Sequence, residues 1–185
     1  MVKIMCLIIL ALEARGLYIS ISERHWKIFA FYTQLSNIIT AVSAILVIIL
    51  GQTPFTTLLR YLSSCMLLMT FIVTTCVLVP MGGDAKQLLF SGNGIYHHLL
   101  IPIISIASYL LIEQHVKSAS AILLPTMVTF LYGVAMLWLN YKGLFDGPYP
   151  FFRVKKQSVK ATVLWMTILI AAIAGLSAVL YLLGR

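Results

Sequence analysis

The chain has 185 residues, of which 61% are hydrophobic and only 10% are charged, and its formal net charge is +8. Soluble domains carry about a quarter charged residues, so this composition excludes an ordinary soluble domain and predicts an all-α integral membrane protein. The basic residues flank apolar stretches, so we expect them to reflect membrane topology and lipid headgroups, and we expect no nucleic-acid partner. The three cysteines lie in apolar stretches without metal-type spacing, which argues against disulfides and zinc.

Six stretches are apolar and long enough to cross a bilayer as helices, which takes about 20 residues each. They are residues 2–21, 28–50, 57–79, 95–113, 120–141 and 160–183. The first resembles a signal peptide but lacks a small-x-small cleavage pattern before Glu13 and Arg15, so we interpret it as a retained span. Because the links are short, we predict one domain, residues 1–185, folded as a six-transmembrane-helix up-and-down bundle.

The basic residues also predict an orientation. Eight Lys and Arg residues lie on the side of the first, third and fifth loops, and four lie on the other side. The positive-inside rule therefore predicts that the odd-numbered loops are cytoplasmic and that both termini are outside.

Polar residues near the start of two spans form the candidate site. Thr33 lies about six residues, or about 9 Å, into the second span, and Asn37 follows it one turn later on the same stripe. His97 and His98 open the fourth span, which enters from the same side. A histidine could act as the base that activates a threonine hydroxyl. Because such stripes also serve helix packing, the residues alone leave both interpretations open.

Adjacent histidines are about 100° apart on a helix, so at most one of them faces a shared site. Their spacing is not that of a two-histidine metal site, and we expect no metal and no cofactor. Tyr96 and Ser105 are further candidates for contact with a substrate, as is the segment Tyr149–Arg153 in the fifth loop. Its aromatic and basic residues indicate either a headgroup anchor or a lid that attracts an anionic lipid group, with Tyr149 and Arg153 as the contacting side chains.

The ordered set of motifs resembles the androgen-induced-protein-like family of membrane hydrolases, and most closely its uncharacterised six-span prokaryotic relatives. The resemblance covers nearly the whole chain. It is carried by Tyr32–Asn37, by Thr70–Val73, by His97 or His98 followed by Pro102, and by Tyr149–Phe151.

The resemblance implies hydrolysis of fatty acid esters of hydroxy fatty acids, with Thr33 as nucleophile and His97 or His98 as base. Family relatives often carry an acidic residue about one and a half turns after the proline, where this chain has Ala107 and Ser108. The prokaryotic-type motifs and short loops indicate a bacterial plasma membrane. Asn37, Tyr96 or the second histidine could donate to an oxyanion.

Three functions therefore remain open. The first is an intramembrane lipid-ester hydrolase, with a membrane lipid or lipid ester as its partner. The second is a non-catalytic membrane protein that binds a lipid or a protein partner. The third is a small transporter, which would need a polar path through both leaflets. The oligomeric state and the natural substrate are not determined by the sequence.

Overall fold

The computed structural model describes residues 1–146 and 149–185, except for the side chains of residues 23–27. Helices make up nearly all of this part of the chain, and no strand occurs in it. The α-helices are α1 (Val2–Arg24), α2 (Tyr32–Leu50), α3 (Pro54–Val73), α4 (Ile101–Ile112), α5 (Leu123–Tyr141) and α6 (Val159–Leu183). Shorter π-helical segments are Thr74–Leu78, Lys86–Phe90 and Ile95–Leu100, and 3₁₀ segments are His25–Ala30, Ala119–Ile122, Pro150–Phe152 and Val154–Lys156.

The prediction of an all-helical chain with six helices long and apolar enough to span a membrane is confirmed for the described residues. These helical stretches are Val2–Ser22, Tyr32–Leu50, Pro54–Leu78, Ile95–Ile112, Ala119–Tyr141 and Val159–Leu183. The second begins four residues later than predicted, because the apolar residues before it form a 3₁₀ segment that ends at Ala30. The third begins three residues earlier, because Thr53 caps it and Pro54 is accepted in its first turn. Gly147 and Pro148 of the fifth loop therefore lie outside the described residues. So do the side chains of Arg24 and Lys27, two of the eight basic residues counted on the side of the odd-numbered loops.

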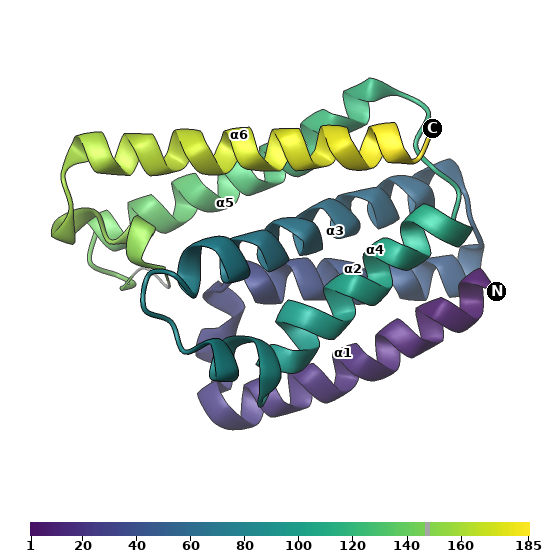
Figure 1. Cartoon of the computed structure of the whole chain (residues 1–185), viewed down its shortest axis with the longest axis horizontal. Coiled ribbons are helices and arrows are strands. Elements are labelled where there is room, and N and C mark those ends of the chain that lie inside the picture. Colours follow the sequence, from purple (N-terminus) through teal and green to yellow (C-terminus); the bar gives the residue numbers. More distant parts are fainter. Residues whose placement is uncertain (147–148) are drawn as a thin grey trace.

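Consecutive helices alternate in direction, and both termini lie at the same end of the molecule (Figure 1). α3 is the central helix, packed against α2, α4, α5 and α6, while α1 packs against α2 and α4. In an up-and-down bundle with short links, helices that follow each other in the sequence pack together, and they do so here except at one link. α5 packs on α6 and α3 instead of α4, because the extended connector after Ile112 carries the chain past α3.

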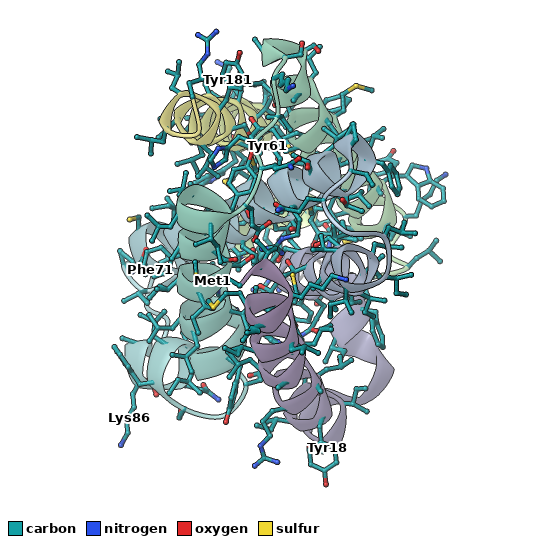
Figure 2. All side chains as sticks on the ribbon, turned by 90° about the vertical axis from the view of Figure 1, so that its right-hand side faces the viewer. Met1, Tyr18, Tyr61, Phe71, Lys86 and Tyr181 are labelled. Atoms are coloured by element: carbon teal, nitrogen blue, oxygen red, sulfur yellow. The ribbon has the colours of Figure 1, made fainter. Side chains whose placement is uncertain are left out.

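The interior contains aromatic and polar groups, and the outer surface is largely apolar. In the end view of Figure 2, Tyr61 lies among the helices, whereas Tyr18 and Lys86 point away from them. The Tyr61 side chain is fully buried and its hydroxyl donates to the carbonyl of Ser177 on α6, 2.7 Å away. Many large aliphatic side chains on the outer face of the helices, such as Leu111, are instead exposed.

A buried ion pair joins α3 to the end of α4. Nε and Nη2 of Arg60 each donate to one carboxylate oxygen of Glu113, at 2.8 Å, and both side chains are 1% exposed. The Ser105 hydroxyl accepts from Nη2 at 3.0 Å, and the Ser108 hydroxyl donates to Glu113 at 2.7 Å. Arg60 is one of the four basic residues counted above on the side of the termini. It lies inside the bundle instead of flanking a span, because Glu113 and the Ser105 hydroxyl accept from its guanidinium.

Candidate functional site

Thr33 lies at the start of α2, at the end of the bundle away from both termini (Figure 1). The helix begins after Phe31, whose backbone is extended, so Thr33 is the second helical residue and is only 7% exposed. The first N–H groups of a helix have no partner within it. The Thr33 N–H therefore remains available, and it points to the phenol oxygen of Tyr149 at 3.4 Å.

The structure brings His98, rather than His97, against Thr33. Oγ1 of Thr33 lies 3.2 Å from Nε2 of His98, and Nδ1 of that ring lies 2.7 Å from the carbonyl oxygen of Leu88. Because a carbonyl oxygen can only accept, Nδ1 carries the proton, and Nε2 of the neutral ring has a lone pair. The Thr33 hydroxyl then donates to Nε2, which is the geometry in which a base takes a proton from a nucleophile.

A close approach of two π-helical segments orients this imidazole. Leu88 lies in Lys86–Phe90 and His98 lies in Ile95–Leu100, with Gly94 immediately before the second segment. A Cβ at Gly94 would lie 2.5 Å from the Leu88 carbonyl oxygen, so a residue with a side chain would push the segments apart. The backbone carbonyl thus performs the orienting role that an acidic side chain performs in many catalytic triads.

Tyr149 provides a third polar contact to Thr33. Its hydroxyl lies 3.4 Å from Oγ1, and since Thr33 gives its own proton to His98, Tyr149 is the donor. Burial raises the pKa of the Tyr149 phenol, so the group stays protonated. The ring of Tyr149 is held in place by two aromatic neighbours. It stacks on Phe151, with the ring centroids 5.2 Å apart, and it makes an edge contact with Phe31, with the centroids 5.9 Å apart.

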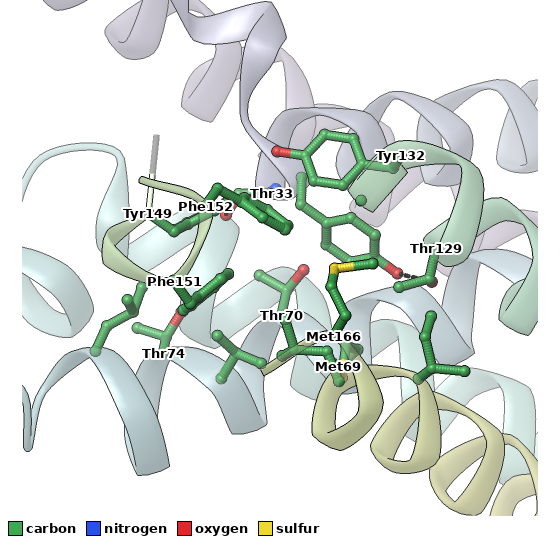
Figure 3. A pocket seen from close by; sticks show the side chains of 16 residues that line it. Thr33, Met69, Thr70, Thr74, Thr129, Tyr132, Tyr149, Phe151, Phe152 and Met166 are labelled. Atoms are coloured by element: carbon green, nitrogen blue, oxygen red, sulfur yellow. Dashed lines mark hydrogen bonds between the residues drawn. The ribbon is translucent and has the colours of Figure 1, made fainter. Parts of the chain in front are cut away.

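Two cavities meet at Thr33. The larger, which we call the polar chamber, has a volume of about 480 Å³. Its wall is formed largely by loop residues and mixes apolar groups with polar side chains, including Gln34, Asn93 and His98. The second, shown in Figure 3, is a narrow cleft of about 40 Å³ between α2, α3, α5 and α6. Its lining is almost entirely apolar and aromatic, and Thr33 and Tyr149 belong to both cavities. The threonine hydroxyl therefore lies where a polar chamber adjoins an apolar cleft.

His97 belongs to a separate buried cluster. Its Nδ1 lies 3.0 Å from Nε2 of Gln34, and its Nε2 lies 3.7 Å from a carboxylate oxygen of Glu13. A Cβ at Gly16 would overlap the His97 ring, so the glycine allows this histidine to pack directly on α1. Asn93 reaches the same cluster through the hydroxyl of Ser20, at 2.9 Å.

The other predicted substrate contacts lie away from the Thr33 hydroxyl. The Asn37 amide donates to the backbone carbonyl of Thr33 at 2.6 Å and faces α1. Tyr96 packs near Gly16, and Ser105 accepts from Arg60, so neither lines the two cavities. Arg153 lines a different pocket, of about 290 Å³, beside the end of α5. Tyr149 is the predicted substrate-binding residue that the structure brings to Thr33.

Two features of the site were missed by sequence reasoning. The Leu88 carbonyl leaves no signal in the sequence, because every residue carries such a group. The apolar cleft depends on Thr70, Tyr132 and Phe152, which come from three different parts of the chain. Within the described residues, no group of three His, Cys, Asp or Glu side chains is arranged to hold a metal ion.

Comparison of this chain with protein-family models, with curated proteins and with solved structures gives no match. The family resemblance therefore rests on the motifs described above, and the function has to be argued from the geometry of the site.

Proposed function

We propose that this chain is a multi-pass protein of a bacterial plasma membrane, with its odd-numbered loops in the cytoplasm. The excess of basic residues in the odd-numbered loops supports the orientation, and the distribution of side chains supports the membrane setting. Leu111 and Val159 are each 80% exposed, whereas Arg60 and His97 are buried. In water, a folded chain buries its aliphatic side chains and exposes its charged ones. In a lipid bilayer, aliphatic side chains can face the lipid while polar groups pair inside the bundle.

Within that setting, we propose that the protein hydrolyses lipid esters, such as fatty acid esters of hydroxy fatty acids, as its family resemblance implies. Thr33 is the nucleophile and His98 is the base. The observation that carries this proposal is the chain of contacts from the Leu88 carbonyl through the imidazole to the Thr33 hydroxyl. It provides a nucleophile, a base with a lone pair toward it, and a group that orients the base.

The reaction proceeds in two steps. His98 Nε2 takes the proton of Thr33 as Oγ1 attacks the ester carbonyl, and the protonated imidazole then gives that proton to the departing alcohol oxygen. The acyl group is left on Thr33. A water molecule from the polar chamber gives a proton to Nε2 and attacks the acyl-threonine, and the imidazolium returns that proton to Oγ1 as the carboxylic acid leaves.

The oxyanion that forms in each step needs hydrogen-bond donors. The N–H of Thr33 and the hydroxyl of Tyr149 are the two donors beside Oγ1. Both lie at the N-terminus of α2, whose dipole favours a negative charge there. This assignment replaces the earlier candidates Asn37 and Tyr96, which lie away from the hydroxyl.

The two cavities suit the two parts of a lipid ester. The apolar cleft would take an acyl chain, and the polar chamber would hold the ester group and water. The cleft has room for only a methylene or two, so an acyl chain enters only when side chains move. Met69 and Met166 line the cleft, and unbranched methionine side chains adjust their shape easily.

Labelling by a fluorophosphonate probe tests the proposal. We expect the purified protein to form a covalent adduct on the peptide that contains Thr33, as read by mass spectrometry. Thr33→Ser keeps a hydroxyl and should still be labelled, while Thr33→Ala should not. A folded protein that neither reacts with the probe nor hydrolyses any lipid ester would contradict the proposal and favour the non-catalytic lipid-binding function.

Replacing Tyr149 by phenylalanine tests the oxyanion donor. The change removes one hydroxyl and keeps the ring that packs on Phe151, so we expect kcat to fall about 10²-fold with little change in KM. Tyr141→Phe, which alters an exposed tyrosine at the end of α5, serves as the matched control. Steady-state kinetics on one ester substrate would check this, and an unchanged kcat in Tyr149→Phe would remove Tyr149 from the mechanism.

A further inference from the structure

A basic pocket lies beside the end of α5, apart from the candidate site. It has a volume of about 290 Å³, and its two walls are the residues at and just after the end of α5 and the segment shortly before α6. Three of its charged side chains are basic, Arg153, Lys155 and Lys156, and one is acidic, Asp146. None of the lining residues belongs to either cavity at Thr33. The function proposed above therefore leaves this basic pocket unused.

The Asn140 side chain joins the two walls of the basic pocket. It is 4% exposed. Its Nδ2 donates to the carbonyl oxygen of Phe145 at 3.2 Å, and its Oδ1 accepts from the N–H of Val154 at 2.9 Å. Phe145 lies in the wall that follows α5, and Val154 lies between Arg153 and Lys155 in the other wall. A buried amide therefore fixes the spacing of the two walls, so the pocket is part of the fold.

The backbone also directs two lysines to this pocket. Gly143, just after α5, has a φ of +72°, a conformation that glycine adopts without strain. A Cβ at Gly143 would lie 3.1 Å from Nζ of Lys155, so the amine lies directly over the turn at the end of α5. Lys156 follows in the 3₁₀ segment Val154–Lys156, where its N–H donates to the carbonyl oxygen of Arg153 at 2.9 Å.

The three basic side chains have no counter-charge from the protein. Among the described residues, none of them forms an ion pair with Asp146 or with any other carboxylate. The Arg153 guanidinium also has no hydrogen-bond acceptor there, although its Nε is buried. Buried donors are nearly always paired, and like charges that line one pocket repel each other. Both effects favour the binding of an anion.

Exposed apolar side chains border the basic pocket. Tyr141 ends α5, Leu144 lines the pocket itself, and Val159 begins α6, and all three are mostly exposed. The end of α5 and the start of α6 lie at the end of the bundle away from both termini (Figure 1). Tyrosine and basic residues together are typical of the membrane interface. An anion in the pocket would thus lie at headgroup level beside surfaces for lipid chains, which favours a lipid phosphate over free phosphate.

We propose that the basic pocket binds the phosphate group of one anionic phospholipid. Arg153 is the main donor, because a guanidinium presents paired N–H groups that match phosphate oxygens. Lys155 and Lys156 add compact positive charges. A zwitterionic lipid carries its own ammonium group, which offsets its phosphate, so the pocket should prefer a headgroup with a net negative charge. The proposal concerns binding and does not depend on the proposed hydrolysis.

The test is equilibrium binding of radiolabelled phosphatidylglycerol to the purified full-length protein in a non-ionic detergent at constant ionic strength. We expect saturable binding that is about tenfold tighter than that of phosphatidylcholine with the same acyl chains. Arg153→Gln combined with Lys155→Gln should weaken binding of the label about tenfold, because each basic residue adds to the attraction of an anionic lipid.

The matched control is Lys86→Gln combined with Lys160→Gln. It removes the same charge from two exposed lysines that do not line the basic pocket, and it should bind like the wild type. Equal affinities in the pocket variant and in this control would overturn the proposal, because surface charge alone would then explain the binding.

Two competition experiments test the identity of the ligand. Phosphatidylcholine that displaces the label as well as unlabelled phosphatidylglycerol does would overturn the preference for an anionic headgroup. Inorganic phosphate that displaces the label, where chloride at the same ionic strength does not, would show that the site takes free phosphate and would overturn the lipid assignment. If the variant of Arg153 does not fold, Lys155→Gln combined with Lys156→Gln changes two exposed side chains and decides the question by the same comparison.

Discussion

Replacing His98 by alanine should lower ester turnover about 10³-fold, within the range by which a general base accelerates proton transfer. The reason is that Nε2 of the His98 ring is the group that accepts the proton of the Thr33 hydroxyl. Without that base the hydroxyl is a weak nucleophile at neutral pH. Steady-state kinetics with a single lipid-ester substrate, with folding checked by circular dichroism, would measure the loss.

The double variant Thr33→Ala with His98→Ala sharpens this test. Groups that act as one unit show strongly non-additive losses, so we expect the double variant to be no slower than Thr33→Ala alone. His97→Ala is the matched control, because this ring contacts Gln34 and Glu13 and makes no contact with Thr33. A larger loss of kcat in His97→Ala than in His98→Ala would contradict the assignment of the base.

Replacing Glu113 by alanine should destabilise the protein by about 3–5 kcal/mol, since it leaves the buried guanidinium of Arg60 without its carboxylate. Both side chains are 1% exposed, so water does not replace the lost partner. Ser105 remains as an acceptor, but a neutral hydroxyl does not balance the charge. Thermal unfolding of wild type and variant in the same detergent would show the difference as a lower Tm.

The control for Glu113→Ala is a double variant, Arg60→Met combined with Glu113→Leu, which replaces both members of the ion pair with apolar residues. Apolar pairs of similar volume often match a buried ion pair in stability, so we expect the double variant to be more stable than Glu113→Ala. Equal Tm values for wild type and Glu113→Ala would show that the pair contributes nothing to holding α3 against α4.

Much of the fold is predictable because it depends on local composition. A run of about 20 apolar residues needs no partner to indicate a span, and each of the six predicted spans overlaps a helix of the structure. The boundaries differ where a local signal competes with the apolar pattern. At the start of α3, Thr53 and Pro54 begin the helix before the apolar run, and at the start of α2 a 3₁₀ segment delays it.

The candidate site is predictable only in part. Thr33 and both histidines stand out because polar groups at membrane depth are unfavourable unless they are satisfied. Tyr149 stands out for another reason, because it belongs to an aromatic and basic segment of the fifth loop. Their pairing is not visible in the sequence, because His98 and Tyr149 are 65 and 116 residues away from Thr33. Neighbouring histidines are chemically identical, and the direction of each ring depends on the helices around it.

The sequence by itself thus determined that the chain is apolar and helical, with six stretches of spanning length, and it indicated which polar residues need an explanation. The tertiary structure decided which of them act together. It paired His98 with Thr33 and with the Leu88 carbonyl, and it placed His97 beside Glu13. The physical reason is that helix formation depends on neighbouring residues along the chain. Hydrogen bonds and cavities between helices depend instead on how distant segments pack.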